Sequence, residues 1–204
     1  MNDNRKSLVE CITFRPQMIR ESSGEGSPYL VRGIMQTKSK KNQNGRIYPD
    51  EILEREVSKY VSNFIQNQKS WGELDHPESS VVSLKNVSHK VLNLEWQDDN
   101  LIGTVEVLNT PNGNILKELL KKGNIGISSR GLGTLKKVSE STSIVGEDFE
   151  LIAFDFVSNP SVFGAFMQPL QESINESIIY NSSYNRWAPA ENLIREILEI
   201  TAEE

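Results

Sequence analysis

The chain has 204 residues, of which 37% are hydrophobic and 25% charged, and its formal net charge is −6. This length predicts one substantial core plus tails, and the acidic balance argues against nucleic acid as a partner. A single cysteine excludes an intrachain disulfide, and with only two histidines besides it we predict no metal and no cofactor. No apolar run approaches about 20 residues, so we predict no membrane span.

The predicted globular domain begins after a polar lead-in. Residues 1–28 mix charges with Ser, Gly and Pro, which predicts a flexible N-terminal segment. An apolar run then predicts a strand over 29–35, and a basic polar loop follows at 38–46. Apolar residues at helical spacing predict an amphipathic helix over 51–67, with Asp50 as its N-cap.

Two strands and a short helix are expected in the middle of the chain. The strands, at 86–96 and 100–108, flank a polar turn. The helix covers 113–122, and Gly123 is a natural C-cap. Residues 139–148 have the composition of a turn region.

The last strand and the tail differ sharply in composition. Residues 149–157 predict a strongly apolar strand, which closes a protease-sized domain over 29–169. From about residue 170 the chain is rich in Ser, Asn, Tyr and Pro, and 190–203 has the pattern of a short amphipathic helix. We therefore predict a linker and a C-terminal interaction helix in 170–204.

Two adjacent serines lie in a glycine-framed stretch, 126–133. A serine there can act as a nucleophile, and Ser129, Arg130 and Gly131 can supply or support oxyanion donors. Because side chains alternate along a strand, Ser128 faces a cleft if the isoleucines beside it face the core. We favour Ser128 as nucleophile and keep Ser129 as the alternative. A plain turn is the structural interpretation of the same residues.

A histidine and a carboxylate complete a candidate catalytic constellation. Pro77 keeps His76 out of a helix, in a loop whose acidic neighbours favour the imidazolium form. Asp155 lies in the apolar strand, where a carboxylate is costly unless it is paired. A base, a nucleophile and an orienting acid are the parts of a serine hydrolase triad, although the sequence does not bring them together in space. A surface histidine is the simpler interpretation of His76.

Four stretches, in this order, resemble the prohead core protein proteases of large contractile-tailed bacteriophages. They are 44–49 (NGRIYP), 72–77 (GELDHP), 126–133 (GISSRGLG) and the strand with Asp155 that precedes Asn-Pro-Ser. The resemblance implies an α+β fold like that of herpesvirus assemblin, a closed, mainly antiparallel β-barrel flanked by helices. It also implies a serine endopeptidase of the assembling procapsid in the host cytoplasm. Its partners would be scaffold or core proteins and the major capsid protein, and a homo-oligomer is allowed.

The resemblance also implies roles for single residues. It assigns the general base to His76 and the nucleophile to Ser128. For the third catalytic residue we favour Asp155. The alternatives are His89, Glu73 and Asp75.

The family cuts after Glu, with Leu or Ile two positions earlier, and this chain carries that tripeptide near both ends. Because cleavage needs an accessible, extended backbone, we expect self-cleavage in the tails. The candidate sites are Glu10, Glu21, Glu172 and Glu176. A cationic pocket for the glutamate is required, and its candidates are Arg32, Lys38 and Arg46.

A different class of function fits the same elements. The chain can instead be a non-catalytic scaffold or assembly β-barrel, in which the histidine and the serines are structural. A serine esterase is a weaker candidate, because the usual Gly-x-Ser-x-Gly elbow is absent.

Overall fold

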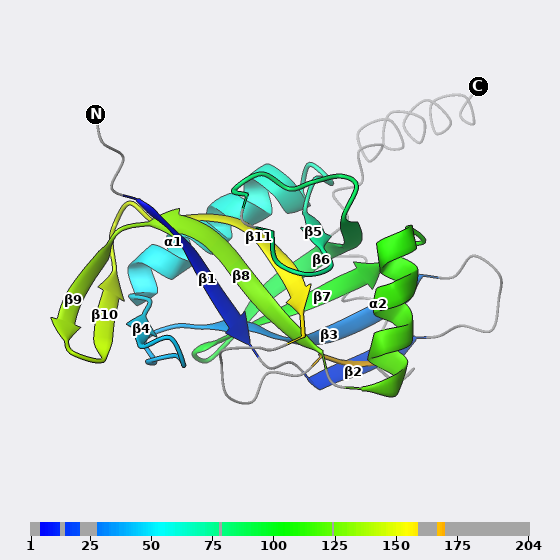
Figure 1. Cartoon of the computed structure of the whole chain (residues 1–204), viewed down its shortest axis with the longest axis horizontal. Coiled ribbons are helices and arrows are strands. Elements are labelled where there is room, and N and C mark those ends of the chain that lie inside the picture. Colours follow the sequence, from blue (N-terminus) through cyan, green and yellow to red (C-terminus); the bar gives the residue numbers. More distant parts are fainter. Residues whose placement is uncertain are drawn as a thin grey trace, which may run out of the picture. The chain divides into compact units, whose positions relative to one another are not determined.

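A computed structural model of the chain describes residues 5–12, 15–20, 28–77, 79–123, 125–158 and 167–169, all within one compact unit. The described strands form three sheets, against which two helices pack (Figure 1). Apolar side chains from different sheets join in one continuous core. Its completely buried members include Val31, Leu101, Val105, Ile127 and Phe156.

The largest sheet has six strands in the order β12-β2-β3-β7-β6-β5. Neighbouring strands are antiparallel, except that β12 runs parallel to β2. The strands predicted at 86–96 and 100–108 are confirmed as the β6–β7 hairpin. The six strands are β2 (Arg15–Arg20), β3 (Tyr29–Thr37), β5 (Trp71–Glu73), β6 (Val87–Gln97), β7 (Asn100–Val107) and β12 (Met167–Pro169).

The serine stretch lies in the middle of a second, three-stranded sheet. β8 (Gly126–Gly133) is its central strand and pairs antiparallel with β1 (Lys6–Ile12) and with β11 (Glu150–Val157). Pairing continues on both sides of the two serines, so they lie inside a strand and not in a plain turn. The apolar strand predicted at 149–157 is confirmed as β11.

A third sheet is built around a polar hairpin. Its order is β4-β10-β9, with β4 (Arg46–Ile47), β9 (Leu135–Ser139) and β10 (Thr142–Val145). In Figure 1 the β9–β10 hairpin extends away from α2, at the far end of the sheets. The sequence predicted only a turn at 139–148, because this hairpin lacks the apolar alternation that marks a half-buried strand.

Both helices pack their apolar faces on the sheets. α1 (Asp50–Tyr60) continues as a π-helical turn (Val61–Ile65) and packs against β11, and α2 (Pro111–Lys122) packs against β6 and β7. The predicted helix over 51–67 is thus confirmed in extent, but its N-cap is Pro49, and Asp50 belongs to the first turn. The N-cap of α2 is Thr110, whose hydroxyl accepts a hydrogen bond from the Gly113 amide at 3.0 Å.

The structure differs from two expectations about architecture. Residues 6–12 and 15–20 form strands, so these parts of the N-terminal segment are not a flexible lead-in. The α+β class with mainly antiparallel sheets is confirmed, but hydrogen bonding among the described strands gives three sheets and no closed barrel. No helix in the described part of the chain has the length and hydrophobicity needed to span a bilayer. The tail over 170–204 lies outside the described residues.

Candidate active site

The pairing of β8 with β11 places a serine directly opposite a carboxylate. Ser128 and Asp155 are partners in this antiparallel register. Directly opposed residues of an antiparallel pair project to the same face, with Cβ atoms about 5 Å apart. Arg130, two positions after Ser128, also projects to this face. The register therefore brings together Ser128 and Asp155, which are 27 positions apart in sequence.

The two serines lie on opposite faces of β8. The Ser129 hydroxyl accepts a hydrogen bond from the Gln36 side-chain amide at 2.8 Å, and Gln36 is itself buried in β3. The Ser128 hydroxyl makes only a long, 3.5 Å contact with the Ser129 carbonyl among the described residues. As predicted from alternation along a strand, the side chains of Ser128 and Ser129 project to opposite faces. Ser128 is nevertheless 0% exposed, so the expectation that it faces an open cleft is corrected.

His76 reaches this face from the loop that follows β5. Leu74 forms a bridge with Phe156, and the Asp75 amide donates to the Phe156 carbonyl at 2.8 Å, so the loop is attached to β11. Asp75 has a φ of 67°, a left-handed conformation that Asp tolerates better than most residues. Its carboxylate accepts the His76 backbone N–H at 3.0 Å. Asp75 therefore shapes the turn rather than contacting the imidazole.

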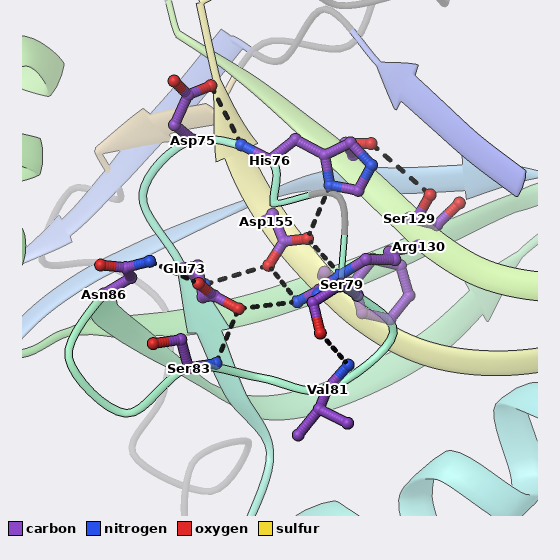
Figure 2. Close-up of polar contacts among 12 residues, drawn as sticks. Glu73, Asp75, His76, Ser79, Val81, Ser83, Asn86, Ser129, Arg130 and Asp155 are labelled. Carbon is purple, nitrogen blue, oxygen red and sulfur yellow. Dashed lines mark hydrogen bonds and ion pairs between the residues drawn. The ribbon is translucent and has the colours of Figure 1, made fainter. Parts of the chain in front are cut away.

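The Asp155 carboxylate is the centre of the cluster (Figure 2). Its Oδ2 lies 3.3 Å from His76 Nδ1, and its Oδ1 accepts the Glu73 backbone N–H at 3.0 Å. Arg130 approaches both oxygens, with Nη2 at 3.2 Å from Oδ1 and Nε at 2.9 Å from Oδ2. The Nε contact is close but not aligned as a hydrogen bond. Asp155 is completely buried, whereas the His76 side chain is 19% exposed.

Arg130 is committed to carboxylates rather than to an oxyanion. Besides Asp155, its Nη2 donates to Glu73 Oε1 at 3.1 Å, and its Nη1 donates to the Ser79 carbonyl at 2.6 Å. Gly131, like Ser129, lies on the opposite face of β8 from Ser128, and a Cβ there would come within 2.4 Å of the Phe149 ring. The Arg130 guanidinium is therefore engaged with these partners, and the oxyanion or support role of Ser129 and Gly131 stays a prediction.

His89, the rival for the third catalytic position, is a buried structural histidine. Its Nε2 donates to the Phe154 carbonyl at 3.0 Å, and its Nδ1 lies 2.9 Å from the Ser88 hydroxyl. Its ring packs edge-on against Phe156, with the ring centres 4.6 Å apart. A Cβ on Gly72 would come within 2.1 Å of His89 Nε2, so the glycine is needed for close packing. Both ring nitrogens of His89 are already engaged.

Protonation of His89 is expected to destabilise the fold. Burial lowers the pKa of His89 from 6.5 to about 4, so between these pH values His89 is protonated in the unfolded chain and neutral in the folded chain. The free energy of unfolding should therefore fall between pH 6.5 and about 4, by roughly 3 kcal/mol in total. Urea unfolding of a His89→Gln variant across this range should lack that component. An unchanged pH dependence in the variant would contradict the assignment.

A second buried carboxylate lies on β1 beside the serine stretch. Glu10 pairs with Ser129, and the next residue of β1 pairs with Ser128. The Glu10 carboxylate accepts hydrogen bonds from Arg46 Nη1 at 2.7 Å, Asn44 Nδ2 at 2.8 Å and the Tyr48 hydroxyl at 3.0 Å. Asn42 donates to the same carboxylate. Glu10 is therefore completely buried yet fully hydrogen-bonded.

The donors around Glu10 form a site built for a carboxylate, which we call the Glu10 pocket (Asn42, Asn44, Arg46 and Tyr48). Burial, followed by the adjacent Glu10 charge, raises the pKa of Tyr48 well above 10.0, so the phenol remains a donor. From the sequence, residues 44–49 stand out only by their family resemblance, and Arg46 is the one donor among the four that was a candidate for binding the substrate glutamate. The chain turns between these donors, with Gly45 at a φ of 72° and its amide donating to the Asn42 carbonyl at 3.0 Å, so a tight turn rather than a regular extended strand brings them together.

The other predicted residues have different surroundings. Arg32 pairs with Glu95, and Lys38 pairs with Glu54, so neither is placed at the Glu10 pocket. The self-cleavage candidates Glu21, Glu172 and Glu176 lie outside the described residues. No group of three His, Cys, Asp or Glu side chains in the described ranges is arranged to hold a metal ion.

Comparison with known proteins gives one consistent answer. The family model for the prohead core protein serine protease matches residues 9–177. The prohead core protein protease of Enterobacteria phage T4 is 32% identical over 151 residues, which cover 72% of this chain and 70% of that protein. The solved structure of the bacteriophage T4 capsid assembly protease aligns with a TM-score of 0.71 and 25% identity, over 78% of this chain and 100% of that one. The chain therefore belongs to the prohead core protein serine protease family.

Proposed function

We propose that this protease cuts core and capsid proteins inside the phage procapsid, with Ser128 as nucleophile, His76 as general base and Asp155 as orienting acid. The observation that carries the proposal is the position of Asp155, which is paired with Ser128 in the sheet and lies 3.3 Å from His76 Nδ1. The printed names of its relatives, a prohead core protein protease and a capsid assembly protease, support the substrates and the compartment. A homo-oligomer stays a prediction.

Each role follows from the chemistry of peptide hydrolysis. When Asp155 accepts the Nδ1 proton of His76, Nε2 carries the lone pair that removes the Ser128 proton. The serine oxygen then attacks the scissile carbonyl, and the imidazolium returns the proton to the leaving amine. A water molecule, activated by the same imidazole, hydrolyses the acyl-enzyme. The 3.3 Å contact should shorten when His76 becomes positively charged, because charge-assisted hydrogen bonds are the shorter ones.

We propose that the Glu10 pocket recognises the glutamate that precedes the cut. Glu10 ends the tripeptide Leu8-Val9-Glu10, and its carboxylate is held by a guanidinium, amide groups and a phenol. A substrate glutamate needs the same partners, since a buried carboxylate must be both hydrogen-bonded and neutralised. The pocket lies beside β8, on the face to which Ser129 projects, and the bond after Glu10 runs along the strand that carries Ser128.

Replacing Arg46 with Met is expected to lower kcat/KM for a Leu-x-Glu peptide about 10- to 100-fold, the equivalent of one hydrogen bond to a charged group. The matched peptide with Gln in place of Glu should lose much less, so the preference for Glu over Gln should collapse. Both peptides are measured on the same preparation, which cancels any loss of folded protein. Lys40→Met is the control, because Lys40 is an exposed cation paired with Asp99. A retained preference for Glu would exclude Arg46 from recognition.

We also propose self-cleavage after Glu10. The residue belongs to the Leu-x-Glu tripeptide, and the bond that follows it lies along β8, opposite the two serines. Since β1 is hydrogen-bonded to β8 and Glu10 is buried, this cut should be slower than cleavage of a free peptide of the same sequence. N-terminal sequencing of the incubated chain tests the site directly.

Covalent labelling tests the function without assuming a substrate. A fluorophosphonate probe should modify the purified chain at one serine, and peptide mapping by mass spectrometry should place the adduct on Ser128. Prior denaturation should abolish labelling, because an isolated serine is a poor nucleophile. Labelling at another residue would overturn the nucleophile. If no serine reacts before or after the N-terminal cut, the scaffold function is the better conclusion.

A further inference from the structure

Three charged side chains are buried together beneath His76. Glu73, Arg130 and Asp155 are each 0% exposed, and Arg130 is in contact with both carboxylates (Figure 2). The triad uses only Asp155. A buried arginine beside that carboxylate opposes the triad, because it cancels the negative charge that should attract the His76 imidazolium. A further negative charge must therefore offset the positive charge of Arg130.

We propose that Glu73 is a positioning residue of the protease, whose charge neutralises Arg130 so that Asp155 keeps its attraction for the His76 imidazolium. This inference rests on the proposed catalytic role of His76. With Glu73 and Asp155 negative and Arg130 positive, the buried cluster has a charge of −1. Protonation of His76 then makes the whole site neutral, which favours the imidazolium formed during catalysis. Without Glu73, the cluster would be neutral before His76 gains its proton.

The contacts of Glu73 show that it also fixes the loop that carries His76. Its Oε1 accepts the Ser83 backbone N–H at 2.9 Å, and its Oε2 accepts from the Asn86 side-chain amide at 3.1 Å. Arg130 binds the same loop through the Ser79 carbonyl at 2.6 Å. One buried ion pair thus binds the loop between β5 and β6 at Ser79, Ser83 and Asn86. A substitution must therefore remove charge while keeping shape, and Glu73→Gln does so.

The groups around His76 are few enough for its titration to be interpretable. Asp75 lies on its own loop, and its carboxylate bonds to the backbone rather than the ring. Burial raises the pKa of the Tyr60 phenol above its ordinary value of 10.0, so Tyr60 stays neutral in any practical range. The titratable and charged groups around the site in the described part of the chain are Glu73 from β5, Asp155 from β11, Arg130 from β8, Tyr60 from α1, His89 from β6, and Asp75.

An NMR titration of the histidine Cε1 protons tests the inference in a Ser128→Ala background, where no self-cleavage is expected. The chain has two histidines, and His89 is buried with a pKa lowered to about 4, so the two signals should titrate separately. Glu73→Gln should lower the measured pKa of His76 by about one unit, the effect of removing one nearby charge in a partly buried site. A pKa unchanged within about 0.2 units would overturn the proposal.

Two further variants separate charge from structure. The double variant Glu73→Gln, Arg130→Met again has a cluster charge of −1, so the pKa of His76 should return to within about 0.3 units of the parent value. If the pKa of His76 in the double variant is instead about one unit below the parent value, as predicted for Glu73→Gln, the inference is overturned. Because this result is judged against the parent, it is decisive even if the single variant fails to fold. Glu56→Gln is the matched control, because Glu56 is a buried, ion-paired carboxylate in α1. Glu56→Gln should leave the pKa of His76 unchanged.

Reactivity provides a readout of the catalytic role itself. In the chain with Ser128 present, the rate of fluorophosphonate labelling is measured against pH. In Glu73→Gln the acid limb of this profile should shift to lower pH by the same one unit, whereas misplacement of the loop would lower the rate equally at all pH values. A uniform loss would overturn the positioning role. Failure of Ser128 to react at all in the parent chain would reject the proposed function, while the NMR titration would still decide the effect of Glu73.

Discussion

Replacing Ser128 with Ala should reduce peptide cleavage by about 10⁶-fold without unfolding the protein, because removal of the nucleophile disables the triad as a unit. The Ser128 hydroxyl makes one long contact among the described residues, at 3.5 Å from the Ser129 carbonyl, so its loss should cost little stability. The measurement is the initial rate with a fluorogenic Leu-x-Glu peptide, together with urea unfolding of both proteins.

Ser129→Ala is the matched control for that experiment. It removes a hydroxyl from the next residue of the same strand, but on the face where Ser129 accepts from Gln36. Leaving the buried Gln36 amide without that partner should cost about 1–3 kcal/mol of stability, while the folded fraction stays active. Loss of activity in Ser129→Ala alone would make Ser129 the nucleophile. Equal cleavage by both variants and the parent would show that the chain does not hydrolyse peptides through this stretch.

Replacing Arg130 with Met should lower the free energy of unfolding at pH 7 by about 3–5 kcal/mol, the largest stability effect that we expect. The change leaves Glu73 and Asp155 buried without their shared cation, and it frees the Ser79 carbonyl at the same time. Two neighbouring carboxylates without a counter-charge hold on to protons, so their pKa values should rise in the folded variant.

That rise gives the Arg130→Met variant a characteristic pH dependence. A carboxyl group whose folded pKa is raised takes up protons more readily when folded, so the deficit relative to the parent should shrink as the pH falls from 7 towards 5. Urea unfolding at several pH values measures it. Arg55→Met is the control, because Arg55 is 40% exposed in its pair with Glu56 and should cost no more than about 1 kcal/mol. A similarly small loss for Arg130→Met would contradict the buried cluster.

Local pattern was sufficient for the elements whose apolar spacing is regular. The hairpin of β6 and β7, the helix α2 and the strand β11 all follow from periodicity, because each has one apolar face that must be buried. The pattern was insufficient for β1, β2 and the β9–β10 hairpin. The β9–β10 hairpin is largely polar, and β1 and β2 mix apolar with charged residues without regular alternation. β1 becomes a strand by pairing with β8, which is more than 100 residues away in the chain. Such pairing is a property of the assembled sheet and leaves little local signal.

By itself, the sequence determined the residue types of the site and the face of β8 on which Ser128 lies. The family resemblance assigned roles to His76 and Ser128 and made Asp155 the favoured third residue, and alternation along an extended strand separated Ser128 from Ser129. These conclusions depend on short stretches of chain, within which covalent geometry limits where each side chain points.

Tertiary structure alone decided which buried charges meet. Asp155 rather than His89 contacts His76, Arg130 binds carboxylates rather than facing an oxyanion, and Glu10 enters a pocket of donors from 42–48. Each contact joins segments at least 25 residues apart in sequence, the separation of Arg130 and Asp155. The physical reason is that burial makes an unpaired charge costly, so the fold must supply partners that no local pattern specifies.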